Sequence, residues 1–381
     1  QLSLRNDQIN IHIMFESRIL FIVGVVFIRV KGQTINNHAS YGISEQIQSS
    51  IHNLNGENPC PNAEDIAPCI CSANVSGAGD FRQEMKCANI SDSEELTRIF
   101  QSTMPVTNFT SLYIHDSDIS GLHNGVFGDV TFEEVDIECH SLNAVEEDVF
   151  INMWPTLIHL NIYHGILEDF PYKTLVNSKS LTSLNVYSNN IGVILPISNS
   201  NLEWISISYN PITELPKGTF QELPHLYAFQ ISHTNISELP DDFLCGNDDL
   251  AWVDLSFNNI QHISSGTFNI TSSDLSLIEL GHNSITSLDV DAFIFPASRE
   301  GLLMLNLFFN NISVLPEEVW RPLLEQDVQI DLFENNLDCG CDIAWLVLDD
   351  SLMQSHRLNR AQCYNGTSIE DLDQSYYLEN C

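Results

Sequence analysis

The chain has 381 residues, of which 43% are hydrophobic, so it is long enough and apolar enough to bury a large core. It carries 51 acidic and 14 basic residues, which gives a formal net charge of -37 at pH 7. A surface this negative repels nucleic-acid phosphates and anionic lipid headgroups, so nucleic-acid binding and peripheral attachment to a membrane are disfavoured.

The first stretch of the chain has the features of a secretory signal. A short charged start at Met14 is followed by the apolar run Ile19–Ile28, and small residues precede Gln33. A run of this length is too short to span a bilayer but suits the core of a signal peptide. We expect residues 1–32 to be upstream sequence and a signal peptide; the alternative is an anchored amphipathic segment. No second apolar run of spanning length follows, so we expect a secreted, extracellular product without a membrane span.

The next features agree with a secretory route. Residues 33–59 are polar and lack apolar periodicity, so we expect a flexible polar leader. The 10 cysteines fit an oxidising compartment, where pairing is the default. Asn-x-Ser/Thr sequons predict a glycoprotein, and the candidate sites are Asn74, Asn89, Asn108, Asn235, Asn269, Asn311 and Asn365.

One apolar pattern recurs along most of the remaining chain. Written as L-x-x-L-x-L-x-x-N-x-L, it is clearest in Leu250–Ile260 (LAWVDLSFNNI) and Leu302–Ile312 (LLMLNLFFNNI). Further copies begin at Phe109, Phe132, Leu157, Leu181, Leu202, Leu226 and Leu275, and a partial copy begins at Asp327. The starts lie 21 to 27 residues apart, within the roughly 20–29 residues of leucine-rich repeats, and residues 60–381 resemble that family.

The repeat defines the expected architecture. One copy cannot bury the inward residues of its short strand alone, so the copies must stack around one continuous core. We expect an α/β fold, a leucine-rich-repeat solenoid: a curved horseshoe with a parallel concave sheet, an irregular or short-helical convex side, and disulfide caps at both ends. The expected segments are an N-terminal cysteine cap at 60–108, about ten repeats at 109–337 and a C-terminal cysteine cap at 338–381.

Two further positions recur within the repeats. An aromatic residue or leucine about 18 residues after most of these starts should fill the convex side: Phe127, Phe150, Leu175, Phe220, Phe243, Phe268, Phe293 and Trp320. The template Asn should satisfy backbone groups where the strand bends away, and it is present as Asn189, Asn210, Asn258, Asn283, Asn310 and Asn335. Other residues replace it at Ser117, His140, Gly165 and Thr234, so we expect a less regular N-terminal half.

Two clusters of cysteines flank the repeats. Cys60, Cys69, Cys71 and Cys87 precede them, and Cys339, Cys341, Cys363 and Cys381 follow. Zinc binding is an alternative by ligand count, but Cys-x-Cys without Cys-x-x-Cys or a His pair is poor zinc spacing. Both clusters resemble the cysteine caps of extracellular leucine-rich-repeat proteins. That resemblance implies the pairs Cys339–Cys363 and Cys341–Cys381, with Cys60–Cys71 and Cys69–Cys87 as one of three connectivities open to the N-terminal cluster.

Two cysteines remain outside the caps, Cys139 and Cys245. Four repeats at roughly 4.8 Å per strand place them about 19 Å apart, well beyond the reach of a disulfide. Each is therefore either an unreacted thiol or bonded to another chain.

The sequence contains no motif of a known catalytic or metal site. It lacks G-x-S-x-G, H-E-x-x-H and a glycine-rich phosphate loop. The segment DSDISG from Asp116 begins like a calcium loop, but Phe127 occupies the twelfth position, where a bidentate Glu is needed. We expect no catalytic residue, cofactor or defined metal site, and hence not an enzyme.

The strand residues that point away from the core form the concave face. The position before the template Asn is occupied by Asp116, Cys139, His164, Ser188, Tyr209, His233, Phe257, His282, Phe309 and Glu334. Aromatic residues edged with acids suit a basic or amphipathic protein partner, because aromatics commonly anchor interfaces. The candidate partner-binding residues are Tyr163, His164, Tyr187, Trp204, Tyr209, His233, Trp252, Asp254, Phe257, Glu279, His282 and Phe309. The alternative is that these rings serve only strand packing.

Several segments are similar to a narrower group. PCPNAEDIAPCIC from Pro59, ELTRIF from Glu95 and CGCDIAWLVLDD from Cys339 resemble arthropod secreted proteins akin to the non-catalytic subunit of Oplophorus luciferase. The resemblance spans most of residues 59–381 and implies a companion to a small catalytic subunit. Three hypotheses follow: a secreted glycoprotein that binds protein through its concave face, a non-catalytic subunit of a luciferase-like monooxygenase complex, and an enzyme, for which no catalytic constellation is found.

Overall fold

The computed structural model describes residues 59–75, 81–297, 299, 301–326 and 328–381. The chain divides into two units, Gln1–Glu57 and Asn58–Cys381, and every described residue belongs to the second. The expected signal peptide, nearly all of the polar leader and the start of the partial repeat at Asp327 lie outside the described residues.

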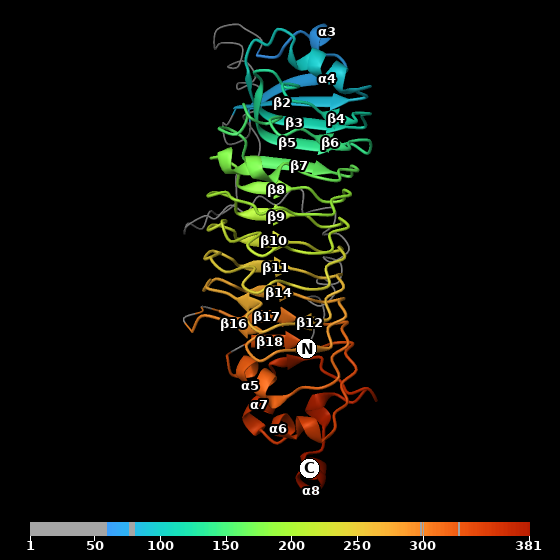
Figure 1. Cartoon of the computed structure of the whole chain (residues 1–381), viewed down its shortest axis with the longest axis vertical. Helices are drawn as coiled ribbons and strands as arrows, with labels where there is room; N and C mark the ends of the chain where they lie inside the picture. The colour runs from blue at the N-terminus through green and yellow to red at the C-terminus, as the bar shows by residue number, and fades with distance from the viewer. Residues whose placement is uncertain (1–58, 76–80, 298, 300, 327) are drawn as a thin grey trace, which may run out of the picture. The chain divides into compact units, whose positions relative to one another are not determined.

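One strand from each repeat joins a single 13-stranded sheet, in which strand order follows sequence order. The first pair, β1 with β2, is antiparallel, and each later pair is parallel. Figure 1 shows the strands one above another through the second unit. They are β1 (Ile70–Val75), β2 (Phe81–Ala88), β3 (Asn108–His115), β5 (Thr131–Glu138), β7 (His159–Tyr163), β8 (Ser183–Asn185), β9 (Trp204–Ser206), β10 (Ala228–Gln230), β11 (Trp252–Asp254), β14 (Leu277–Glu279), β17 (Leu303–Asn306), β18 (Val328–Asp331) and β19 (Leu358–Asn359).

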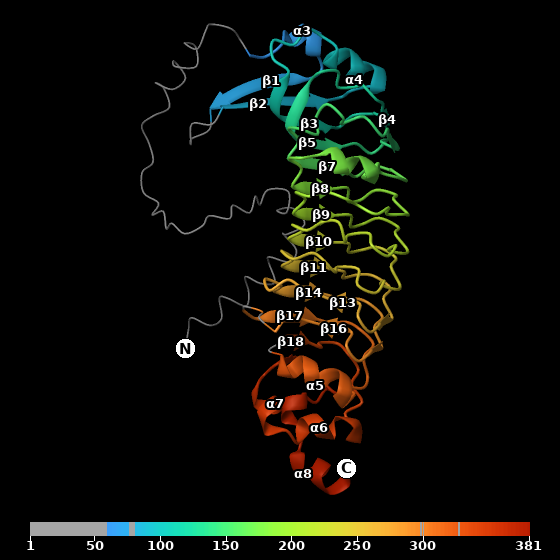
Figure 2. The same cartoon turned by 60° about the vertical axis from the view of Figure 1, so that its left-hand side comes forward.

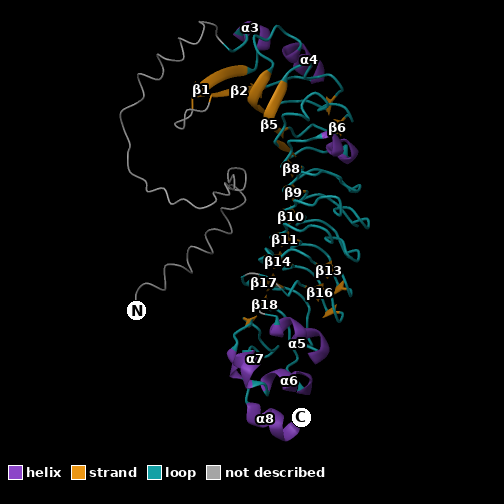
Figure 3. Ribbon diagram, turned by 90° about the vertical axis from the view of Figure 1, so that its left-hand side faces the viewer, coloured by secondary structure: helices purple, strands orange, loops and turns teal. Residues whose placement is uncertain are grey.

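The side opposite the sheet consists mainly of loops, as Figure 3 shows. Short strands pair across neighbouring repeats there: β4 (Gly121–Leu122) with β6 (Ala144–Val145), β12 (His262–Ile263) with β15 (Ser287–Leu288), and β13 (Phe268–Asn269) with β16 (Phe293–Ile294). Helical segments on the return path are η1 (Tyr172–Asn177) and α5 (Glu317–Glu325). This parallel sheet with an irregular opposite side confirms the predicted leucine-rich-repeat class.

The template residues form a continuous core through the stack. In the copy that starts at Leu250, the side chains of Leu250, Val253, Leu255 and Ile260 are all fully buried. The residues predicted about 18 positions after each start are buried too. Their rings meet across repeats, for example Phe268 and Phe293 with centroids 4.8 Å apart. Because each apolar residue contacts neighbours from adjacent copies, no repeat has a core of its own.

The amide of Asn258 shows how the template Asn joins neighbouring repeats. Its Nδ2 atom donates to the carbonyl oxygen of Ile231 (2.8 Å) in the preceding repeat and to that of Leu255 (3.1 Å) in its own. Its Oδ1 atom accepts from the backbone N–H of Ile236 at 3.3 Å. Equivalent hydrogen bonds are made by Asn189, Asn210, Asn283, Asn310 and Asn335. Each amide thereby satisfies backbone groups of two repeats.

A second amide position on the return path was missed in the sequence. The Nδ2 atoms of Asn199 and Asn247 donate to the carbonyl oxygens of Leu175 (2.8 Å) and Phe220 (2.9 Å) in the preceding repeats. Both asparagines stand three residues before the first template leucine, so their shared offset was the available signal.

Two of the early repeats depart from the template. The placement of Cys139 on the concave face is wrong, because its side chain is buried and its Sγ atom lies 3.2 Å from the carbonyl oxygen of Ser117. A small thiol is a weak donor that tolerates such burial. At Gly165 an added Cβ would lie 2.7 Å from Oδ1 of Asn189 and 3.0 Å from the carbonyl oxygen of Leu142. The series of hydrogen-bonded template asparagines, which we call the asparagine ladder, accordingly begins at Asn189. This agrees with the less regular N-terminal half that we expected.

Helices and disulfides cover both ends of the sheet. Figures 1 and 2 show α3 (Ala63–Ile66) and α4 (Ser93–Phe100) beyond one end, and α6 (Ala344–Val347), α7 (Asp350–Gln354) and α8 (Gln374–Asn380) beyond the other. Two short 3-10 helices, η2 (Cys341–Ile343) and η3 (Ile369–Asp371), complete the C-terminal cap. The disulfides are Cys60–Cys71, Cys69–Cys87, Cys339–Cys363 and Cys341–Cys381, the pairs implied by the family resemblance.

Candidate functional site

The strand register aligns the outward residues of the concave face in rows. The first row includes Trp204, Ala228, Trp252, Leu277 and Met304. The acid–amide row, two positions later, contains Asp136, Asn161, Asn185, Ser206, Gln230, Asp254, Glu279, Asn306 and Asp331. The third row, two positions further on, includes Tyr163, Tyr187, Ser208, Ser232, Ser256, Gly281, Phe308 and Phe333.

Five of the predicted residues form one continuous aromatic stack. Successive ring centroids are 4.2, 4.1, 4.1 and 4.5 Å apart, with interplanar angles of 10 to 11°. The members of this aromatic stack, one from each of five consecutive repeats, are Tyr209, His233, Phe257, His282 and Phe309. Near-parallel rings at this spacing attract one another and hold each other in place.

The backbone at the stack does not require aromatic residues. All five residues lie in the left-handed region with φ between 51 and 56°, which is unusual for bulky side chains. Ser188 and Glu334 hold the same conformation at the equivalent position, each with φ of 54°. Tyr209, Phe257 and Phe309 are 42, 42 and 43% exposed, so packing against their neighbours does not bury them fully. The ring surface is therefore available to a partner.

A separate aromatic group lies towards the N-terminal end of the concave face. The rings of Tyr163 and Tyr187 stack at 5.1 Å and 9°, and His164 meets both edge-on. The hydroxyl of Tyr163 donates to Asp136 at 2.9 Å. Ser188 interrupts the row between His164 and Tyr209. With the pair formed by Trp204 and Trp252, the structure places the predicted aromatic residues in three groups and not in one stripe.

The two tryptophans belong to strands β9 and β11, which flank β10. Their ring centroids are 5.3 Å apart with an interplanar angle of 42°. Ala228 occupies the first-row position between Trp204 and Trp252, and its small side chain is buried. The Nε1 atom of Trp252 is buried without an acceptor among the described residues.

Carboxylates lie in the acid–amide row beside the stack. Asp254 is buried and accepts from Nε2 of Gln230 (3.0 Å) and from the hydroxyl of Ser256 (2.6 Å). Burial raises the pKa of Glu279 to about 7; a hydrogen bond from Asn306 lowers it, while the charges of Asp254 and Asp331 raise it further. A raised pKa means that the surroundings of Glu279 in the acid–amide row disfavour its negative charge.

The histidines of the stack are uncharged near neutral pH. Burial lowers the pKa of His233, and His282 lowers it further, whereas Asp254 acts in the opposite direction. Burial alone lowers the pKa of His282. The stack therefore presents neutral rings, and the negative charge of this region comes from the acid–amide row.

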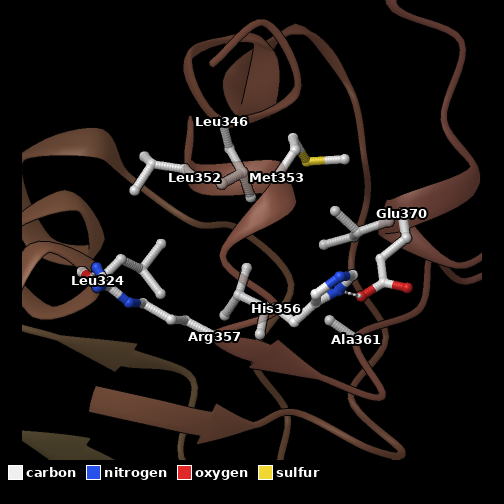
Figure 4. Close-up of a pocket in the computed structure, with 10 residues that line it drawn as sticks. Leu324, Leu346, Leu352, Met353, His356, Arg357, Ala361 and Glu370 are labelled. Carbon is white, nitrogen blue, oxygen red and sulfur yellow. Dashed lines mark hydrogen bonds and ion pairs between the residues drawn. The ribbon is translucent and has the colours of Figure 1, made fainter. Parts of the chain in front are cut away.

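The described part of the chain shows no cluster of side chains placed for metal binding. Across the described ranges, no group of three or more His, Cys, Asp or Glu side chains is placed to hold a metal ion. Phe127, at the twelfth position of the calcium-like segment, is buried in the core. A cavity of about 20 Å³ lies in the C-terminal cap beside Leu346, Met353 and the His356–Glu370 pair (Figure 4), with room for about one water molecule. Of the helices within the described ranges, none is long and apolar enough to cross a membrane.

The predicted sequons differ in exposure. The side chains of Asn74, Asn89, Asn108, Asn235, Asn311 and Asn365 are exposed. Asn269 is half-buried, and its Nδ2 atom donates to Asp242 at 3.0 Å. Asn235 and Asn311 each stand two residues after a member of the aromatic stack.

A family model and several known proteins are similar to this chain. A family model described as "Leucine rich repeat" matches residues 200–260. The Listeria monocytogenes internalin inlF is similar in structure at 19% identity, over 65% of this chain and 66% of that one, with a TM-score of 0.48. Bovine osteomodulin (Bos taurus) is 22% identical over 296 residues, which cover 65% of this chain and 60% of osteomodulin.

A stronger relationship extends over most of the chain. The non-catalytic subunit of Oplophorus-luciferin 2-monooxygenase from Oplophorus gracilirostris is 30% identical over 346 residues. The alignment covers 84% of this chain and 88% of the relative. The chain therefore belongs to the leucine-rich-repeat family that includes the non-catalytic subunit of Oplophorus-luciferin 2-monooxygenase.

Proposed function

We propose that the chain is a secreted glycoprotein that binds another protein through its concave face and has no catalytic role of its own. The observation that carries this proposal is the aromatic stack. Five rings lie in register at positions where the backbone accepts serine or glutamate equally well, and three of them remain more than 40% exposed.

Such a surface is suited to anchoring a protein partner. Aromatic side chains bury a large apolar area, and they are enriched at the energetically dominant centres of interfaces. Rings that already hold one another in place lose little conformational freedom when a partner covers them. The polar acid–amide row and the serines of the third row give the rim that usually surrounds an interface core.

Several features support an extracellular location. Four disulfides close the two caps, and such bonds persist in oxidising compartments. Six of the seven predicted sequons have exposed asparagines. The apolar run Ile19–Ile28 further suits a signal peptide.

A second candidate function is that of a non-catalytic subunit in a luciferase-like monooxygenase complex. The 30% identity over 88% of the Oplophorus subunit favours it. It makes a distinct prediction, because the concave face would then hold a small catalytic protein, and activity would belong to that partner. Light emission on adding Oplophorus luciferin to the captured complex, but not to the chain alone, would support this candidate.

The test is affinity capture from the extracellular fluid of the source organism with tagged residues 33–381. The variant to compare is Tyr209→Ser, Phe257→Ser and Phe309→Ser combined, because Ser188 shows that serine fits this backbone. A matched control changes the exposed residues Val193, Val290 and Val314 to Ser, all outside the rows of the concave face. We expect one partner to be retained by wild type and control and lost from the stack variant, whereas equal capture by all three would contradict the proposal.

A further inference from the structure

The C-terminal cap shows how the concave face holds a guanidinium group. Arg360 donates from Nε to Oδ1 of Asp331 at 3.2 Å, and its Nη2 atom contacts the other carboxylate oxygen. The same guanidinium lies over the ring of Phe333, 4.7 Å from the centroid. Asp331 belongs to the acid–amide row and Phe333 to the third row of the same repeat. An acid and a ring two residues apart thus form a two-sided site for a planar cation.

Related chemistry occurs in the neighbouring repeats. Phe308 occupies the third-row position equivalent to Phe333, one repeat earlier. Its ring extends across Gly281 of the preceding repeat, since a Cβ added there would lie 2.6 to 2.9 Å from three atoms of the Phe308 ring. Gly281 follows Glu279 by two residues, and Glu279 is registered with Asn306 of the next strand. Phe308, Glu279 and Asn306 therefore gather an aromatic face, a carboxylate and an amide at one place.

One polar atom at this place has no partner, and one carboxylate lies among like charges. Asn306 is only 8% exposed, and its Oδ1 atom is buried without a hydrogen-bond donor among the described residues. The neighbouring Glu279 accepts a hydrogen bond from Asn306, but it also lies near the like-charged Asp254 and Asp331 of the same row. Strands β5 to β18, all in described ranges, contain no Lys or Arg. A cationic donor from outside the chain would satisfy both the amide oxygen and the carboxylate.

We propose that Glu279, Asn306 and Phe308 form a second guanidinium site, which receives an arginine side chain from the protein bound to the concave face. This inference rests on the proposed function and names the chemistry of the partner. Arginine fits better than lysine, because a planar guanidinium can donate to Glu279 and Asn306 together while its face covers the ring of Phe308. The negative net charge of the chain also favours approach of a cationic segment.

The probes that test this site are N-acetyl-arginine amide, its lysine analogue and its uncharged citrulline analogue, titrated against residues 33–381 at pH 8 and low salt by saturation-transfer NMR. The variants are Glu279→Gln and Phe308→Ser, the latter chosen because Ser208, Ser232 and Ser256 occupy the same row. Glu214→Gln is the control with the same charge change at an exposed position outside the rows.

We expect saturable binding of the arginine probe by wild type and Glu214→Gln, and at least tenfold weaker binding by both site variants. The lysine probe should bind more weakly, and the citrulline probe should not compete. Absence of arginine binding to wild type, or equal binding by Glu279→Gln, would overturn the proposal. Capture of a partner that depends on the aromatic stack, combined with no arginine binding, would reject this site alone. Arginine binding without partner capture would instead count against the proposed function.

Discussion

The rings of His233 and Phe257 lie nearly parallel, with centroids 4.1 Å apart and planes 10° from each other, although the two residues are 24 positions apart in the sequence. This centroid distance is slightly less than the roughly 4.8 Å between neighbouring strands, so rings of neighbouring repeats are in contact. The contact exists because both residues stand at the same left-handed position of consecutive repeats. Aromatic residues that recur about every 24 positions in the sequence therefore form one continuous stack on the concave face.

The high pKa of Glu279 predicts a dependence of stability on pH. The pKa of Glu279 rises from 4.5 to about 7 on folding, so between these values the folded chain keeps a proton that the unfolded chain has lost. Its contribution to the free energy of unfolding is full below pH 4.5 and is lost as the pH rises through about 7. Glu279→Gln should lie within about 1 kcal/mol of wild type at pH 5 and exceed its stability at pH 8 by on the order of 1–3 kcal/mol.

Urea unfolding at both pH values checks this prediction. Asp254 and Asp331 face Glu279 in the same row and remain in both proteins. Glu214→Gln, at an exposed position, is the control and should show no such difference between pH 5 and pH 8. A variant Glu279→Gln that is no more stable than wild type at pH 8 would show that this carboxylate is well solvated.

The close approach at Gly165 predicts that this position does not accept a side chain. Alanine there would meet Oδ1 of Asn189 at 2.7 Å and the carbonyl oxygen of Leu142 at 3.0 Å, so the start of the ladder must shift. We expect Gly165→Ala to lower the free energy of unfolding by about 1–3 kcal/mol. Gly192→Ala is the matched control, because no atom lies within 4 Å of a Cβ at Gly192. Equal stability of the two variants in thermal unfolding would argue against the tight contact.

The ladder amide of Asn258 should be among the costliest polar groups to remove. Asn258→Ala leaves the carbonyl oxygen of Ile231 and the N–H of Ile236 without this partner, for a loss of about 2–4 kcal/mol. Asn258→Thr should lose less, since Thr234 occupies the equivalent position one repeat earlier. Asn259→Ala, one residue away and exposed, should be close to neutral in the same denaturation measurement.

The two cysteines outside the caps should differ in reactivity. The thiol of Cys139 is buried against the carbonyl oxygen of Ser117, whereas Cys245 is only half-buried. Iodoacetamide should therefore label Cys245 in the native protein and Cys139 only after unfolding, as read by peptide mass spectrometry. Labelling of Cys139 first would contradict the packing of the second repeat, and a disulfide-linked dimer should involve Cys245.

The sequence predicted the parts of this molecule that depend on periodicity. Recurring leucines and asparagines repeat one local chemistry, so Leu255 and Asn258 could be placed in the core and the ladder without a structure. Cys139 was misplaced because its position in the template does not reveal that a thiol can be buried where other repeats turn a side chain outward. The contact between the rings of Trp204 and Trp252 depends on the small side chain of Ala228 between them. The hydrogen bond from Arg360 to Asp331 depends on the conformation of the C-terminal cap. Such contacts join residues whose spacing follows no period.

The central claim is that the aromatic stack holds a protein partner, and side-by-side capture with wild type, the Tyr209→Ser/Phe257→Ser/Phe309→Ser variant and the valine-to-serine control tests it most directly. Circular dichroism and thermal unfolding should first show that all three proteins fold alike. We predict that one extracellular partner is captured by wild type and control and is lost from the stack variant. Retention of that partner by the folded stack variant would show that the five rings only pack against one another.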